Sequence, residues 1–178
     1  MVINRLRKAF FLDRDGVLIK TKVINGKPYA IKKVEELEIL PKVLHSINRI
    51  KNSNYLVIVI TNQPDVGNKI VDRKDVDKIN RKLSKIISID RIYVCYHSQK
   101  DNCLCRKPRI HFFNKAAKDY NIDLKKSFMV GDRNTDILAG NRAGCKTIFI
   151  DHKYSEKSPK IQNLSAESLF DAVKKANL

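Results

Sequence analysis

Short runs of β-branched and aromatic residues alternate along the chain with segments whose apolar residues recur at helical spacing. This alternation is typical of a parallel sheet covered by helices on both faces. The run Leu56–Ile60 is apolar at every position, as expected for a strand buried on both faces. The pattern predicts strands at Ala9–Leu12, Tyr55–Ile60, Arg91–Val94, Phe128–Val130 and Thr147–Ile150.

Helices are predicted between and after these strands. Pro41 is favoured at a first helical position, so we expect a helix to begin there. The apolar stripes of the first two helices are Val43, Leu44, Ile47 and Ile50, and Val76, Ile79, Leu83 and Ile86. Three more helices are expected at about 110–120, at 136–143 with Gly144 as the stop, and around Leu169, Phe170 and Val173. With no internal repeat and no low-complexity segment, residues 1–178 are predicted to form a single α/β domain with a three-layer, Rossmann-like architecture.

The chain length and its apolar segments limit the class of protein. At 178 residues the chain is about the size of one ordinary domain. No stretch approaches the roughly 20 consecutive apolar residues that a membrane span needs, and the basic N-terminal segment leads into an apolar run too brief for a signal peptide. We therefore expect a cytoplasmic protein, a monomer without a membrane partner, in which cysteines serve as free thiols or metal ligands rather than disulfides.

The chain is strongly basic. Lys and Arg number 36 against 19 Asp and Glu, a formal net charge of +17. Such a surplus attracts phosphorylated small molecules, nucleic acid or anionic lipid, or simply solvates the surface, and composition does not choose among these.

Two carboxylates follow the first predicted strand. Its end reads FLDRDGVL, so Asp13 and Asp15 emerge just past the carboxyl edge of the sheet, with Gly16 able to take the backbone angles of a sharp exit. In open α/β sheets, ligands bind at that edge. Taken alone, the two residues are also compatible with a solvated turn.

Three further segments bring polar residues to the same edge. The second strand ends in TNQ (Thr61, Asn62, Gln63), and CRKP supplies Arg106 and Lys107 ahead of a helix. The fourth strand ends in VGDRNTD, which contains Asp132, Arg133 and Asp136. These groups together predict a phosphate site rather than a decorated turn.

Hydrolysis of a phosphate monoester by a covalent route needs a nucleophile, an acid for the leaving oxygen, and cations. Asp13 is the predicted nucleophile, and Asp15 the acid that then serves as base for the hydrolytic water. Magnesium is expected at Asp13, the backbone carbonyl of Asp15, and Asp132. The Lys107 ammonium and the Thr61 hydroxyl are expected to hold the remaining phosphate oxygens.

The order and spacing of these four segments resemble those of the haloacid dehalogenase superfamily. The resemblance covers residues 9 to 150 and implies the same roles: Asp13 as nucleophile, Asp15 as acid and base, Thr61 and Lys107 as phosphate ligands, and Asp132 as a metal ligand. Asp136 is ambiguous: it orients the metal shell or Lys107, or it caps the following helix. Since 47 residues separate Asp13 from Thr61, no large cap domain fits between them.

A second cluster lies in CYHSQKDNCLC, where Cys95, His97, Cys103 and Cys105 fall within eleven residues. Three thiolates and one imidazole make a complete tetrahedral set, which predicts a structural zinc site rather than a catalytic one. The loop would fix Arg106 and Lys107 at the mouth of the site. Cys145, outside the cluster, is expected to be an inert buried thiol.

This loop just before R-K-P resembles the zinc loop of heptose-bisphosphate phosphatases and of the related histidinol-phosphate phosphatases. The resemblance implies a small phosphorylated sugar, a heptose 1,7-bisphosphate first and histidinol phosphate second. Asn62 and Gln63 are then expected near substrate, with Arg106 and Arg133 on a second anionic group. Tyr29 falls where those enzymes place a tyrosine near substrate, although an aromatic packed under a loop is an equally good interpretation.

The sequence also departs from the heptose-phosphatase pattern, because Pro64–Lys69 replaces the usual S-G-I after TNQ and predicts a different substrate loop. A DNA 3'-phosphatase and a non-catalytic nucleic-acid-binding zinc module remain as weaker alternatives. The second would have no use for three converging carboxylates, which repel phosphate in the absence of metal. Nucleic acid is therefore not the expected partner.

Overall fold

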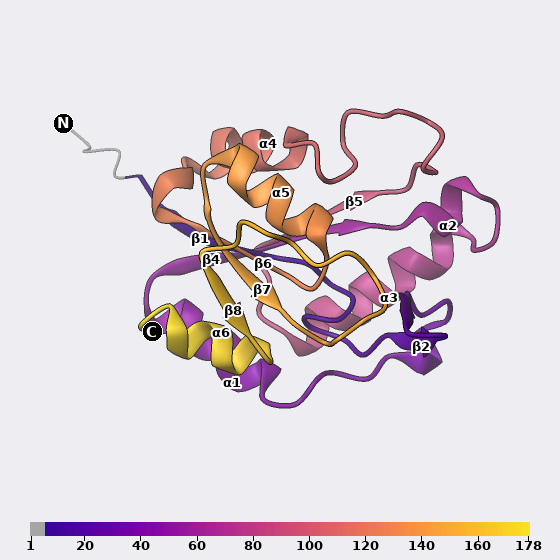
Figure 1. Ribbon diagram of the computed structural model, residues 1–178, viewed down its shortest axis with the longest axis horizontal. Coiled ribbons are helices and arrows are strands. Elements are labelled where there is room, and N and C mark those ends of the chain that lie inside the picture. The colour runs from indigo at the N-terminus through magenta and orange to yellow at the C-terminus, as the bar shows by residue number, and fades with distance from the viewer. Residues whose placement is uncertain (1–5) are drawn as a thin grey trace.

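The computed structural model describes residues 6–178 (Figure 1). Residues 1–5, part of the basic N-terminal segment, lie outside the described residues. Within residues 6–178, six strands form one parallel sheet in the order β5-β4-β1-β6-β7-β8. The strands are β1 (Lys8–Leu12), β4 (Tyr55–Asn62), β5 (Arg91–Cys95), β6 (Phe128–Gly131), β7 (Lys146–Ile150) and β8 (Leu164–Ala166). The five predicted strands are confirmed, and β8 is an additional edge strand.

Helices cover both faces of the sheet, as Figure 1 shows. On one face lie α1 (Val43–Asn52), α3 (Arg73–Ile86) and α6 (Leu169–Lys175), and on the other lie α4 (His111–Tyr120) and α5 (Asn134–Ala143). A short helix, α2 (Pro64–Gly67), follows β4, and single 3-10 turns occupy Val34–Glu36 and Leu124–Lys126. The three-layer architecture is therefore the one that the sequence predicts.

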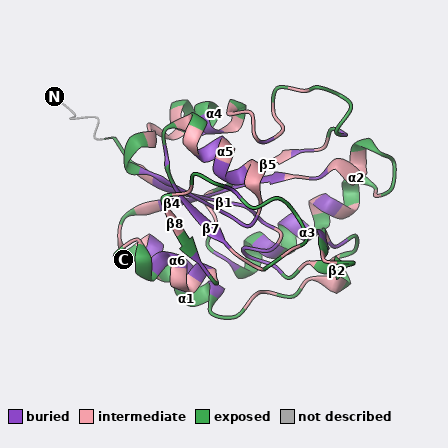
Figure 2. Ribbon diagram, in the orientation of Figure 1, coloured by how far each residue is buried: buried purple, intermediate pink, exposed green. Residues whose placement is uncertain are grey.

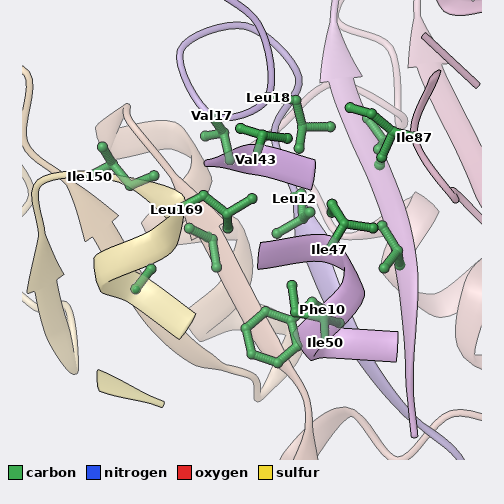
Figure 3. Packing of buried hydrophobic residues seen from close by; sticks show 14 of the residues in the cluster. Phe10, Leu12, Val17, Leu18, Val43, Ile47, Ile50, Ile87, Ile150 and Leu169 are labelled. Carbon is green, nitrogen blue, oxygen red and sulfur yellow. The ribbon is translucent and has the colours of Figure 1, made fainter. Parts of the chain in front are cut away.

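The side chains of β1 divide between the two cores because successive residues of a strand point to opposite faces. Phe10 and Leu12 pack with residues of α1, α3 and α6. Figure 3 shows both side chains together with Ile47 and Ile50 of α1 and Leu169 of α6. Ala9 and Phe11 pack with α4 and α5. The strands β1, β4, β6 and β7 are accordingly buried over most of their length, while the outer helix surfaces are exposed (Figure 2).

Two details of the predicted helices are wrong. Helix α1 begins at Val43, two residues after Pro41, because Lys42 takes a left-handed conformation with φ of 60° before the helix starts. Leu44 and Ile86 do not belong to the buried stripes, since each is more than two-fifths exposed on the outer face of its helix. The predicted stop at Gly144 is confirmed by its left-handed φ of 82°.

The segment between β1 and α1 contains a hairpin, which is not among the elements that the apolar pattern predicts. Strands β2 (Lys22–Ile24) and β3 (Lys27–Tyr29) pair in antiparallel fashion across Asn25 and Gly26, both of which have positive φ. An Asn-Gly pair is a strong hairpin signal because a two-residue turn of this kind needs positive φ at both positions. The hairpin stands at the carboxyl edge of the sheet, beside the candidate site.

Candidate active site

Three strand ends bring carboxylates and hydroxyls to one edge of the sheet. Asp13 directly follows β1, and its backbone N–H donates to the carbonyl of Val130 in β6 at 3.0 Å. Thr61 is the last residue but one of β4, on the other side of β1, and Asp132 follows β6. Parallel pairing with β1 at the centre therefore fixes the three side chains around one point.

The centre of the site is a cluster of buried carboxylates around one lysine. Oxygens of Asp13, Asp132 and Asp136 all lie within 4.8 Å of one another, and each residue is less than a tenth exposed. The Lys107 ammonium lies 3.0 Å from Oδ1 of Asp13 and 2.7 Å from Oδ1 of Asp136. Three carboxylates against one ammonium leave the cluster short of positive charge.

The carboxylate of Asp132 shows that shortage directly. Its Oδ1 is buried and has no hydrogen-bond partner. Burial, followed by the neighbouring charges of Asp13 and Asp136, raises the pKa of Asp132 well above its usual value. A divalent cation that prefers oxygen ligands would give Oδ1 a partner and would offset the repulsion among the buried carboxylates. Asp13 and Asp132 therefore fit a magnesium ion.

The sharp turn after β1 is what lets the Asp132 side chain approach so closely. Gly16 has a φ of +79°, and a β-carbon built on it would lie 1.9 Å from Oδ2 of Asp132. Any side chain at this position would therefore displace a predicted metal ligand. The Nε2 atom of His152, from the segment after β7, lies 2.7 Å from the Gly16 carbonyl oxygen and adds a contact on this turn.

Asp136 has both of the roles that its position in the sequence allowed. Its Oδ2 accepts from the backbone N–H of Arg133 at 3.0 Å, which caps α5, while Oδ1 pairs with Lys107. Burial raises the pKa of Asp136 to about 6, although the ammonium of Lys107 opposes that rise. Burial alone would lower the pKa of Lys107, but Asp13 and Asp136 outweigh it and raise the pKa. Lys107 therefore stays a cation inside the protein.

Lys107 is also held by contacts to β4. Its ammonium donates to the Ile60 carbonyl at 2.6 Å. The Asn62 side chain accepts from the backbone N–H of Lys107 at 3.1 Å and donates to its carbonyl at 3.2 Å. In this structure, the amide that the sequence predicts near substrate is thus occupied in fixing the backbone of Lys107.

Asp15, Gln63 and Thr61 form a second group at the edge. One Gln63 amide nitrogen lies 2.8 Å from Oδ2 of Asp15 and 2.8 Å from the Thr61 hydroxyl. Arg14, whose side chain is fully buried, donates from Nε and Nη2 to the two oxygens of Asp15 at 3.0 and 3.1 Å. Asp15 is consequently held in one orientation beside the cleft.

A cleft of about 770 Å³ opens above these residues. Asp13, Asp15, Thr61 and Lys107 line it, as do Tyr29, Arg106 and Arg133 from its rim. Nη1 of Arg106 is buried without a partner. Arg133, by contrast, donates to the Pro28 carbonyl at 3.1 Å and to Oε1 of Glu156 at 2.8 Å. The rim cations therefore differ: Arg106 retains an unpaired donor, and Arg133 is ion-paired.

The thiol cluster comes together in the loop after β5. The measured separations between Cys95, His97, Cys103 and Cys105 run from 3.2 to 3.7 Å. A tetrahedral ion with metal–sulfur bonds of about 2.3 Å needs ligand atoms about 3.7 Å apart, so the four donors are close to that arrangement. Arg109 holds the loop from below through the carbonyls of Asn102 and Cys103. Burial raises the pKa of Cys145, outside the cluster, to about 12, as expected of an inert thiol.

Sequence reasoning missed Arg14, Glu156 and Asn80, whose Oδ1 accepts from Nη1 of Arg14 at 2.9 Å. Arg14 lies inside the Asp13–Asp15 segment, but nothing in that segment indicates that its side chain is buried. Asn80 is read from the sequence as one polar position on a helix, and Glu156 lies in a segment without periodicity. Each of the three makes a hydrogen bond to a residue that is distant in the chain.

Comparisons with known proteins agree with this geometry. A family model described as "HAD-hyrolase-like" matches residues 104–164. The chain is 31% identical over 175 residues to the D-glycero-beta-D-manno-heptose-1,7-bisphosphate 7-phosphatase of Helicobacter pylori, covering 94% of this chain and 98% of that one. It is 30% identical to the histidine biosynthesis bifunctional protein HisB of Baumannia cicadellinicola, covering 80% of this chain and 40% of that one.

A solved structure gives the same fold. It is a D,D-heptose 1,7-bisphosphate phosphatase from B. bronchiseptica complexed with magnesium and phosphate, with a TM-score of 0.82 and 26% identity over 96% of this chain and 98% of that one. The fold, the carboxylate cluster and these relatives define a phosphoric monoester hydrolase. The chain belongs to the haloacid dehalogenase superfamily, whose phosphatases use magnesium. Among the described residues, no helix is both long and apolar enough to span a membrane.

Proposed function

We propose that this enzyme hydrolyses the 7-phosphate of D-glycero-D-manno-heptose 1,7-bisphosphate and releases heptose 1-phosphate. The observation that carries the proposal is the buried Asp13 carboxylate beside the Lys107 ammonium, at the floor of a cleft whose rim holds an unpaired Arg106 donor. The first group suits the phosphate that reacts, and the second suits a phosphate that does not. Relatives named for this reaction support the substrate.

In the first step, a carboxylate oxygen of Asp13 attacks phosphorus and forms an aspartyl-phosphate. The bond between phosphorus and the sugar oxygen breaks, and Asp15 gives its proton to that oxygen. In the second step, Asp15 removes a proton from water, whose oxygen attacks the same phosphorus. The bond between phosphorus and the Asp13 oxygen breaks, inorganic phosphate leaves, and the Asp13 carboxylate and the protonated Asp15 are restored.

Asp13, Asp132 and the backbone carbonyl of Asp15 would hold magnesium. When bound, the ion supplies positive charge against the phosphoryl oxygens and against the three crowded carboxylates. The roles of the protein's own residues are separate. Lys107 binds a phosphoryl oxygen while paired to Asp13 and Asp136, and the Thr61 hydroxyl binds another.

The distal phosphate is assigned to Arg106. A planar guanidinium binds phosphate through two parallel hydrogen bonds, and Arg106 lines the cleft without a salt bridge to any described carboxylate. Arg133 and Tyr29 line the same cleft. Because Arg133 is already paired with Glu156, its contribution to the distal phosphate is the smaller one.

The thiol cluster is assigned to one structural zinc ion, bound by Cys95, His97, Cys103 and Cys105. Four donors at tetrahedral separations leave no position for water, which supports a structural role. Only Arg106 lies between Cys105 and Lys107 in the chain, so the ion would fix Arg106 and Lys107 against the cleft.

The cleft is proposed to be open, within a single domain. The segment between Asp13 and α1 contributes the hairpin β2–β3 but no larger insertion, which supports an enzyme without a cap domain. We further propose that the enzyme acts as a cytoplasmic monomer on a small soluble sugar phosphate, as suits an open site and a substrate of that size.

One panel of substrates tests the proposal. Phosphate release is measured with heptose 1,7-bisphosphate, heptose 7-phosphate, histidinol phosphate and a 3'-phosphorylated DNA end, each with magnesium. We expect the largest kcat/KM for the bisphosphate. A larger value for histidinol phosphate would instead assign the enzyme to the reaction of its histidine-biosynthesis relatives, and a larger value for DNA would implicate the basic surface.

A further inference from the structure

The side chain of Arg14 is the largest among the fully buried residues, yet it is not expected to contact substrate. It lies between Asp13 and Asp15 in the sequence, and its backbone carbonyl accepts from the N–H groups of Leu18 and Ile19 at 2.9 and 3.1 Å. These bonds close the turn after β1. The guanidinium thus points away from the cleft while it grips the carboxylate of Asp15 from behind.

The grip on Asp15 uses a fork of two donors. Nε and Nη2 of Arg14 reach the two oxygens of Asp15, and Gln63 donates to one of the same oxygens at 2.8 Å. Three donors on two oxygens resist rotation of the carboxylate. A guanidinium that turned in its own plane would break this fork, since the two parallel bonds need one orientation.

The third nitrogen of Arg14 is what fixes that orientation. Nη1 donates to Oδ1 of Asn80 at 2.9 Å, in a contact that joins residues 66 apart in the chain. Asn80 lies on α3, is 9% exposed, and does not line the cleft. Without its carbonyl oxygen, a buried guanidinium donor would be unpaired, and the guanidinium would gain by turning toward another acceptor.

We propose that Asn80 is a positioning residue for the acid–base step, acting through Arg14 on Asp15. This inference rests on the proposed role of Asp15 as acid and base. It connects helix α3, which otherwise packs one face of the sheet, to proton transfer at the carboxyl edge. The contact aims the carboxylate of Asp15 at the leaving oxygen rather than binding phosphate.

The test separates proton transfer from binding. Values of kcat/KM are measured for a series of phosphate monoesters running from nitrophenyl to alkyl leaving groups, in the parent and in Asn80→Ala. A good leaving group departs without a proton, whereas an alkoxide does not. We expect kcat/KM for alkyl esters to fall about tenfold more than for nitrophenyl phosphate, a fraction of the 10² to 10⁴ typical of a full acid–base group.

Two further variants keep the result interpretable. Asn80→Asp retains an oxygen acceptor for Arg14 and should restore the parent's dependence on leaving group. Ile79→Val, in the same helix and core, weakens packing without removing a contact of Arg14. It should change kcat/KM by the same factor for all substrates. Melting temperatures of all three confirm that they fold.

The outcomes also distinguish this inference from the proposed role of Asp15. Asn80→Ala could lower kcat/KM equally for every substrate, or for none, while Asp15→Asn steepens the dependence of kcat/KM on the leaving group. In that case the positioning inference is overturned and the role of Asp15 stands. If Asp15→Asn leaves that dependence unchanged, the acid role itself fails, and the positioning inference fails with it.

Discussion

The acidic cluster and the thiol cluster differ in where their residues come from. Asp13 and Asp132 follow different strands of the sheet and Asp136 lies in the first turn of a helix, and a buried lysine pairs with Asp13 and Asp136. The thiol cluster is drawn from eleven consecutive residues, which are the last residue of β5 and the loop that follows it. The positions of the acidic residues depend on the whole sheet, whereas those of the thiol cluster depend on one short segment.

The two clusters also differ in how complete they are. The acidic cluster opens onto a cleft, has an unpartnered oxygen on Asp132, and carries its own cation. The thiol cluster has four donors at near-tetrahedral separations. An open, incompletely neutralised set of ligands suits a reacting group, whereas a closed set suits architecture. Damage to the first cluster should therefore affect rate, and damage to the second should affect stability.

The largest expected effect is that of Asp13→Asn. An amide does not form the aspartyl-phosphate, so kcat should fall by at least about 10³-fold. The melting temperature of the metal-free protein should be no lower than that of the parent, because one of three crowded carboxylates loses its charge. Turnover within tenfold of the parent would remove Asp13 as the nucleophile.

Asp15→Asn should come next. Loss of the acid and base is expected to lower kcat by about 10² to 10⁴-fold, since both leaving-group protonation and hydrolysis of the intermediate are slowed. Magnesium affinity should change little, because the proposed metal ligand at this position is the backbone carbonyl. Rapid-quench measurement of the phosphoenzyme checks both steps, and an unchanged rate with an alkyl phosphate contradicts the assignment.

Arg106→Ala tests the bridge between the two clusters. Loss of a bidentate contact to the distal phosphate should cost about 2 kcal/mol, or about thirtyfold in kcat/KM for the bisphosphate. The value for heptose 7-phosphate should change far less. Arg91→Ala is the matched control, because it removes a charge at the amino end of β5, the end opposite the cleft. The kcat/KM values for both substrates should stay unchanged in this variant.

The smallest effect on rate is expected from Cys103→Ser. Elemental analysis of the gently purified parent should find about one zinc per chain, and the variant should lose it, melt several degrees lower, and bind substrate more weakly. Cys145→Ser, outside the cluster, should keep its zinc even where the buried hydroxyl lowers stability. Parent protein that is equally stable and active without zinc would make the cluster incidental.

Chelation separates the clusters in a single sample. Brief treatment with EDTA should abolish activity that magnesium alone restores, with the melting temperature nearly unchanged. Prolonged treatment with a zinc-selective chelator should lower the melting temperature, and magnesium should not recover it. Full activity in metal-free buffer would contradict the proposed mechanism.

The sequence allowed the sheet and the residues of both clusters to be predicted, for physical reasons. Buried parallel strands such as Leu56–Ile60 are apolar throughout, and their carboxyl ends converge, so Asp13 and Asp132 are placed without knowledge of the helices. The thiols are close together in the sequence, so their meeting needed little folding. Asp136 could not be assigned because a helix cap and a lysine partner leave the same trace in the sequence.

Other features depend on contacts that no local pattern records. Strand β8 has three residues and pairs at the edge, too short for periodicity to indicate it. The pairing of Arg133 with Glu156, and of Arg14 with Asn80, joins segments that are distant in the chain. The hairpin β2–β3 is different, since its Asn-Gly turn is a local signal that the sequence itself contains.

The segment that carries the hairpin β2–β3 can accept insertions at small cost. Its stems are closed by backbone bonds from Lys20 to Glu38 at 2.9 Å and from Leu40 to Leu18 at 3.0 Å. Since its two ends already lie side by side, a longer insert would add little loop-closure cost, about 0.6 kcal/mol for each doubling of length. This part of the cleft rim can thus be lengthened at small cost while the carboxylates behind it stay in place.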